Sequence, residues 1–150
     1  MDIIIRKGVA ADMEAVHGLV CELAEYERSL AEVKTGPDEF KQALERHAFQ
    51  TLLACNAESG EILGAALYYF AYSTWKGSYL WLEDFIVRSA YRRQGIGKLL
   101  FDAVVDIAAE QNSFMKWQVL DWNTSAMDFY AQYNSEVQNE WLTCRLTTRS

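Results

Sequence analysis

The chain has 150 residues, 51% of them hydrophobic, and carries a net charge of −7. This length and composition suit one folded domain over residues 1–150 with a sizeable core, and they exclude a disordered chain. The acidic balance argues against general binding to nucleic acid, whose phosphates need a basic surface. It is compatible with a cationic substrate, but on the charge alone a role in solubility is the better explanation.

No apolar run is long enough to span a bilayer, and the N-terminus lacks the apolar core of a signal peptide. We therefore expect no membrane association and a cytoplasmic location. Cys21, Cys55 and Cys144 are widely spaced and flanked by apolar residues, which predicts three buried small side chains rather than disulfides or a zinc site. His17 and His47 have no partner at metal-ligand spacing, so no metal site is expected.

Hydrophobic periodicity predicts strands and helices in a mixed order. The predicted strands are 2–6, 51–57, 62–73, 78–87, 114–120 and 140–146. The predicted helices are 12–27, 37–50, 95–111 and 123–133, with Asp12 as the N-cap of the first. The strand–helix–strand centre indicates a mixed α/β domain in which a crossover helix joins two parallel neighbours.

The sequence R-R-Q-G-I-G, residues 92–97, lies between a strand that ends at Val87 and the helix from Gly95. Glycine permits close backbone approaches, and the first N–H groups of a helix are unpaired and lie at the positive end of its dipole. Together with the arginines, this predicts binding of a phosphate or pyrophosphate. A tight turn with a helix cap is the alternative. The segment is not a P-loop, because Lys98 follows Gly97 without the spacing of that motif. It is not a dinucleotide-binding fingerprint either, because Leu100 stands where that motif has its third glycine.

This segment resembles the R-x-x-G-x-G acetyl-CoA motif of the GNAT acyltransferases. "YYFAYSTWKG", "LEDFIV", "YRRQGIG" and "VLDWNTSAMDFY" further resemble the diamine and thialysine acetyltransferase branch, the relatives of spermidine/spermine acetyltransferase. The resemblance implies a GNAT fold over the whole chain, acetyl-CoA as co-substrate and no metal. It implies that two parallel strands, 79–87 and 114–120, splay apart and that the pantetheine arm lies between them.

The resemblance also assigns residues to the cofactor. The backbone of Phe85, Ile86 and Val87 would pair with the pantetheine amides, and the glycine turn would hold the pyrophosphate. The full set of cofactor residues is Phe85, Ile86, Val87, Arg92, Arg93, Gln94, Gly95, Ile96, Gly97, Lys98, Asn123 and Tyr130. Asn123 can in addition cap the last helix through its side chain.

Amine acetylation needs a base and an acid, because an alkylammonium with a pKa near ~10.4 is protonated at neutral pH and the departing thiolate needs a proton. The resemblance places the acid at Tyr130, for which a packed core tyrosine is the alternative. It favours Glu83 for substrate binding and proton relay. Asp84, its neighbour on the strand, is a further candidate for binding the substrate. We expect the two carboxyl groups to lie on opposite faces unless a bulge intervenes, so that they do not form one paired site. The alternative is that both are structural acids with hydrogen bonds to the backbone.

Tyr26 and Trp75 can line an amine channel, since aromatic faces suit alkyl cations, and Glu27 can lie at its acidic mouth. Plain packing or solvation is as good an account of each. Polyamine-specific relatives carry an extra acid where this chain has Ser73 and Thr74, which favours a shorter amine: thialysine, a lysine-like amino acid or a small diamine.

The leading hypothesis is therefore an acetyl-CoA-dependent N-acetyltransferase of a small primary amine. Protein or peptide N-acetylation and a non-catalytic acyl-CoA sensor on the same fold are the alternatives. Relatives form homodimers, which the resemblance implies here as well. Asn134 replaces the glycine that relatives carry after the last helix, and asparagine tolerates the left-handed conformation needed there.

Overall fold

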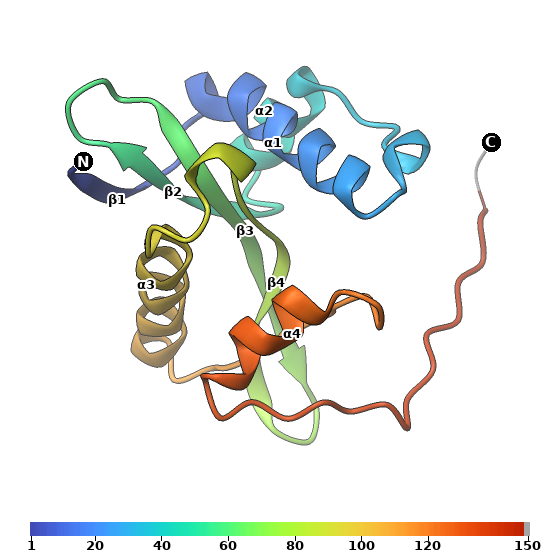
Figure 1. Ribbon diagram of the computed structural model, residues 1–150. Coiled ribbons are helices and arrows are strands. Elements are labelled where there is room, and N and C mark those ends of the chain that lie inside the picture. The colour runs from blue at the N-terminus through green and yellow to red at the C-terminus, as the bar shows by residue number, and fades with distance from the viewer. Residues whose placement is uncertain (149–150) are drawn as a thin grey trace. The chain divides into compact units, whose positions relative to one another are not determined.

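The structure, a computed structural model, describes residues 1–148 and divides the chain into two compact units, Met1–Gln118 and Val119–Ser150. The first unit holds five strands and three α-helices within the described residues (Figure 1). These are β1 (Ile3–Lys7), α1 (Met13–Tyr26), α2 (Pro37–Glu45), β2 (Gln50–Asn56), β3 (Ile62–Ser73), β4 (Gly77–Val87), α3 (Ile96–Glu110) and β5 (Phe114–Trp117). The second unit holds α4 (Thr124–Ala131).

The strands form one sheet in the order β1-β2-β3-β4-β5. The first three pairings are antiparallel, and β4 pairs with β5 in parallel. Because parallel neighbours cannot be joined by a tight turn, α3 makes the crossover between them. The predicted mixed α/β architecture with a crossover helix is confirmed.

Helices cover both faces of this sheet (Figure 1). Ile86 packs into a buried cluster with Val16 and Leu19 of α1, whereas the adjacent Phe85 contacts Phe101 of α3 edge to face at 5.5 Å. Since adjacent strand residues point to opposite faces, α1 and α3 lie on opposite sides of β4. The two faces together bury the core of the first unit.

The start of α1 differs from the expectation. Asp12 makes no side-chain cap bond to this helix. Its carboxylate accepts hydrogen bonds from both Nη atoms of Arg6, at 2.8 and 2.9 Å, and from the Val9 backbone N–H at 2.8 Å. The hydrogen bonds from Arg6 hold the pKa of Asp12 below its usual range. Asp12 thus fastens the end of β1 to the turn before α1 instead of capping the helix.

Two local predictions in the second unit are confirmed, and three predictions in the C-terminal part of the chain are corrected. Asn123 Oδ1 accepts from the backbone N–H of Ala126 at 3.2 Å and so caps α4. Asn134 adopts the left-handed conformation, with φ of 53°. The predicted strand 140–146 does not form, because this segment has no ladder partner in the described part of the chain. Cys144 is consequently exposed, not buried. The strand predicted over 114–120 ends at Trp117.

Candidate active site

A β-bulge in β4 brings two carboxyl groups to one face of the sheet. Asp84 lies opposite Leu67 of β3, but the next pair is Tyr68 with Leu82, so Glu83 is the extra residue. Trp81 and Glu83 share a face, since the indole N–H of Trp81 donates to Glu83 Oε2 at 3.0 Å. The expectation that Glu83 and Asp84 lie on opposite faces is therefore wrong, because a bulge breaks the alternation on which it rests.

This face is the one that α1 covers farther along β4. Leu67 belongs to the buried cluster with α1, and Asp84 is its cross-strand partner. Burial, followed by the negative charges of Glu83 and Glu27, raises the pKa of Asp84 to about 6. Burial also raises the pKa of Glu27, which is half-buried at the end of α1. The three carboxyl groups thus form one acidic cluster, Glu27–Glu83–Asp84, in which Asp84 is the least solvated.

This raised pKa has a consequence for stability. Between about pH 4 and pH 6, native Asp84 binds a proton that the unfolded chain has released, so the free energy of unfolding falls as pH rises through this window. Asp84→Asn removes this dependence. We expect it to raise Tm relative to wild type by about 3–6 °C more at pH 8 than at pH 4.5, measured by thermal unfolding. Asp106→Asn, on the exposed face of α3, is the control, and an equal shift at both pH values would contradict the prediction.

The two aromatic residues predicted to line the amine channel, Tyr26 and Trp75, lie in different surroundings. Tyr26 is near the end of α1, and the guanidinium carbon of Arg92 lies 5.2 Å from the centroid of its ring. Arg92 Nε also donates to the carbonyl oxygen of Val87 at 3.1 Å. Trp75, by contrast, is 84% exposed in the turn between β3 and β4. Within this chain, the structure does not bring Trp75 to the cluster.

The parallel ladder between β4 and β5 ends beside the bulge. β4 pairs with the described residues of β5 only from Tyr79 to Leu82, whereas β4 itself continues to Val87. The side chain of Tyr68 lies opposite Leu82 and is fully buried, and its hydroxyl has no hydrogen-bond partner among the described residues. The unpaired edge of β4 thus begins next to Leu82, the residue opposite the buried Tyr68.

The glycine turn leads directly into α3. Gly95 has φ of 81°, a left-handed conformation that a side chain would disfavour, and Arg93 has φ of 64°. Ile96, the first helical residue, is 1% exposed and anchors the helix to the core. The first N–H groups of this 15-residue helix therefore start at a fixed place on the surface. The exposed side chains of Arg93 and Gln94 flank them, and Lys98 pairs with Asp102 at 3.0 Å.

The sequence that forms these elements matches a known protein family. The sequence model of the acetyltransferase (GNAT) family matches residues 17–134, which include all of the described α-helices and strands except β1 and the beginning of α1. The chain belongs to this family. It is therefore an acyltransferase, and the predicted GNAT fold, with its sheet of one parallel and three antiparallel pairings, is confirmed.

Relatives of this GNAT protein agree with the branch that its motifs resemble. It is 37% identical over 147 residues to a thialysine N-epsilon-acetyltransferase of Bos taurus, and the match covers 92% of this chain and 86% of the relative. It is 32% identical over 137 residues to a thialysine N-epsilon-acetyltransferase of Caenorhabditis elegans, with 89% and 84% covered. A solved integron cassette protein from the mobile metagenome of V. cholerae has a TM-score of 0.77 at 20% identity, over 98% of this chain and 93% of that one; this likeness shows the fold alone.

Tyr130 and Asn123 belong to the second unit of the GNAT protein, and the structure describes that unit by itself. Tyr130 lies in the last turns of α4, and its ring contacts Phe129 at 5.5 Å between centroids. Asn123 holds the start of the same helix. Their assignments to the acid and to the cofactor remain predictions.

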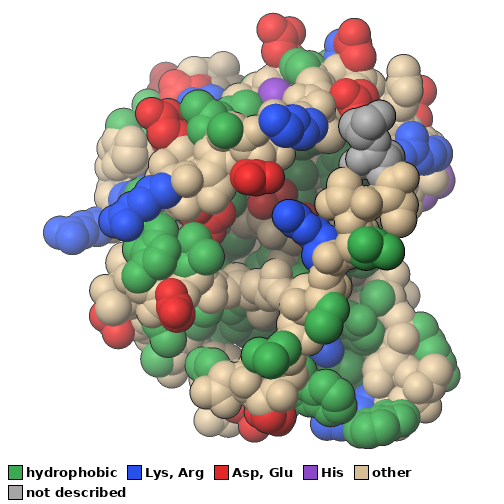
Figure 2. Space-filling view, turned by 90° about the vertical axis from the view of Figure 1, so that its right-hand side faces the viewer, with side chains coloured by type: hydrophobic (Ala, Val, Ile, Leu, Met, Phe, Trp, Pro, Cys, Tyr) green, Lys and Arg blue, Asp and Glu red, His purple; other side chains and the backbone are tan. Residues whose placement is uncertain are grey.

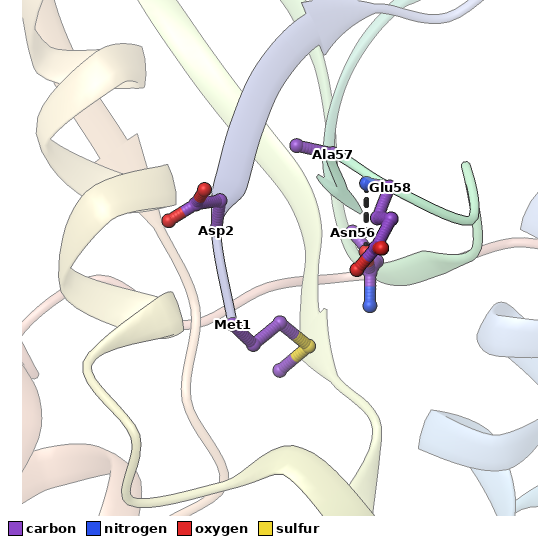
Figure 3. A pocket seen from close by; sticks show the side chains of 5 residues that line it. All are labelled: Met1, Asp2, Asn56, Ala57 and Glu58. Carbon is purple, nitrogen blue, oxygen red and sulfur yellow. Dashed lines mark hydrogen bonds between the residues drawn. The ribbon is translucent and has the colours of Figure 1, made fainter.

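One pocket of the first unit involves none of the predicted site residues (Figure 3). Met1, Asp2, Asn56, Ala57 and Glu58 line it, at the β1–β2 edge of the sheet. There Asn56 Oδ1 accepts from the backbone N–H groups of Glu58, at 2.9 Å, and Ser59, at 3.2 Å. The side-chain oxygen of Asn56 is thus used within the turn.

The described residues contain no group of three histidine, cysteine or acidic side chains that could hold a metal ion. None of the described helices is long and apolar enough to cross a bilayer. Figure 2 shows acidic side chains spread over the face that it draws, without a continuous basic patch. That the protein uses no metal, binds no nucleic acid and resides in the cytoplasm remain predictions.

Sequence reasoning did not single out two residues of this region. Trp81 lies within the predicted strand 78–87 without an assigned role, yet its indole N–H is the donor to Glu83. Tyr68 lies within the predicted strand 62–73, also without an assigned role, and its hydroxyl is buried. The contact of Trp81 depends on the bulge in β4, and the burial of Tyr68 depends on packing between distant elements, so the local pattern reveals neither.

Proposed function

We propose that the protein transfers an acetyl group from acetyl-CoA to a primary amine of a small molecule, namely thialysine, a lysine-like amino acid or a short diamine. The observation that carries this is the acidic cluster Glu27–Glu83–Asp84 on one face of β4, next to the point where the β4–β5 ladder ends. Relatives named for thialysine acetylation support the same class of acceptor.

Acetyl-CoA, the co-substrate of this family, fits the first unit in two places. The β4 edge beyond Leu82 offers strand-like backbone for the pantetheine amides, from Phe85 to Val87. The left-handed Gly95 and the N-terminus of α3 offer N–H groups for the pyrophosphate, with Arg93 beside them. The bound cofactor supplies an activated thioester.

The acidic cluster prepares the acceptor. An alkylammonium is attracted by the three carboxyl groups and must lose a proton before it can attack. A base with a pKa near the operating pH does this best, and Asp84, with a pKa of about 6, is close to that range. Glu83 is oriented by Trp81, so it can anchor the ammonium or relay the proton. Tyr130 then protonates the departing thiolate.

We further propose that residues 1–150 act as a single domain and that the protein is a homodimer. In support, the family match extends from the first unit through α4. Large apolar side chains near the C-terminus, Trp141 and Leu142, are 72% and 86% exposed, which suits coverage by a second chain. Light scattering coupled to size exclusion measures the mass directly.

The function is tested by steady-state release of free thiol from acetyl-CoA. Thialysine, lysine, putrescine, spermidine and a basic peptide serve as separate acceptors. We expect clear turnover of a short amine and weaker turnover of spermidine. Turnover of the peptide alone would favour protein acetylation, and binding of acetyl-CoA without turnover of any acceptor would favour the sensor.

A further inference from the structure

A row of aromatic rings continues from the acidic cluster along the same face of the sheet. We call Tyr69, Tyr79, Trp81 and Phe114 the aromatic strip. Tyr69 lies opposite Trp81 across the β3–β4 ladder, and Tyr79 stacks on Phe114 of β5 with centroids 5.1 Å apart. Tyr69 and Phe114 are each 37% exposed. The strip is therefore an accessible apolar surface that begins next to Glu83.

A single cation lies on this strip. Lys116 is the one basic residue in the described strands β3, β4 and β5. It pairs with Trp81 in the parallel ladder, and its Nζ lies 5.2 Å from the centroid of the Tyr79 ring. Its side chain is exposed, and no salt bridge joins it to a carboxylate within residues 1–148. The face thus carries carboxylates at one end and an ammonium at the other.

We propose that Lys116 binds the carboxylate of the acceptor, so that the preferred substrates are amino acids with a side-chain amine and not diamines. This inference rests on the function proposed above. Glu83 follows Trp81 by two residues, which places the backbones of Glu83 and Lys116 about 8 Å apart. An extended lysine-type amino acid carries its reacting ammonium at one end and its carboxylate at the other. Its ammonium can therefore lie at Glu83 while its carboxylate lies at Lys116.

The same arrangement disfavours a diamine. With one ammonium at the acidic cluster, either class of acceptor places its second ammonium near Lys116. In the amino acid the adjoining carboxylate offsets that charge and can pair with Lys116, whereas in the diamine the two like charges repel without such compensation. The rings of the aromatic strip contact the connecting methylenes in either case and do not discriminate between the two classes. Selectivity between amino acids and diamines therefore depends on the charge of Lys116.

The test compares acceptors that differ only in the carboxylate, with the full-length protein and acetyl-CoA. L-lysine is paired with cadaverine, and L-thialysine with its decarboxylated diamine. We expect wild type to have the lower KM for each amino acid. Lys116→Gln should raise the KM of the amino acids about 5- to 20-fold and leave that of the diamines equal or lower, with kcat little changed. Lys116→Arg should restore most of the preference, because it keeps the charge.

Lys7→Gln, an exposed lysine of β1, is the matched control for charge removal and should change no KM. Circular dichroism establishes that each variant is folded. If wild type acetylates amino acids and diamines alike and Lys116→Gln alters neither, the inference is overturned while the proposed function stands. If wild type acetylates none of the amines, the proposed function fails and the inference fails with it.

Discussion

Tyr130→Phe is expected to lower kcat for amine acetylation by about 10²- to 10⁴-fold, the range that general acid–base groups contribute. The change removes one hydroxyl and keeps the ring, so the contact with Phe129, at 5.5 Å between centroids, can persist. Acetyl-CoA should still bind, because its proposed contacts are mostly backbone groups of β4 and α3. The measurement is thiol release under saturating acetyl-CoA and the best acceptor of the panel.

Tyr133→Phe is the matched control, since it removes a hydroxyl from a neighbouring tyrosine of the same unit. We expect it to retain wild-type kcat. Retention of more than a tenth of the activity by Tyr130→Phe would remove Tyr130 from the role of acid. If the protein binds acetyl-CoA but neither wild type nor variant turns over any amine, the sensor hypothesis would gain instead.

The sequence predicted those parts of the structure that depend on short-range patterns. The apolar run from Ile62 to Ser73 became β3 with those bounds. The glycine turn predicted the start of α3, because the left-handed conformation of Gly95 and the buried Ile96 are properties of neighbouring residues. Asn123 capped α4 for the same reason.

The bulge at Glu83 could not be predicted, because it is a property of how two distant strands align. Nothing in "LWLEDF" marks Glu83 as the residue without a cross-strand partner; the shift appears only in the pairing with Leu67 and Tyr68. The bulge matters for function, since it places in one cluster two carboxyl groups that strict alternation would separate. The role of Asp12 also depends on another element, because its partner Arg6 lies on a strand, outside the helix pattern.

The failed strand at 140–146 has a different cause. Its residues alternate in the way of a strand, but a strand needs a neighbour to receive its N–H and C=O groups. The described chain provides none. A dimer would supply such a neighbour, so the pattern in the sequence and its absence from the isolated chain are compatible under the proposed homodimer.

Phe101→Ala is expected to cost about 3–5 kcal/mol of unfolding free energy, the cost of truncating a buried phenylalanine. Phe101 is 1% exposed, and its ring contacts Phe85 of β4 and Trp117 of β5 edge to face, each at 5.5 Å. It thus packs α3 against both strands where their ladder ends. Such a loss is a large part of the total stability of a domain and lowers Tm by about 6–20 °C.

Leu99→Ala is the control on the same helix, because Leu99 is 50% exposed and should change Tm little. Phe101→Leu should fall between the two, since it retains most of the buried volume. At a temperature where Phe101→Ala remains folded, its affinity for coenzyme A should also fall, because the cavity loosens the two strands at the end of their ladder, where the pantetheine site is proposed. A Tm within 2 °C of wild type would mean that the ring does not hold the two strands in place.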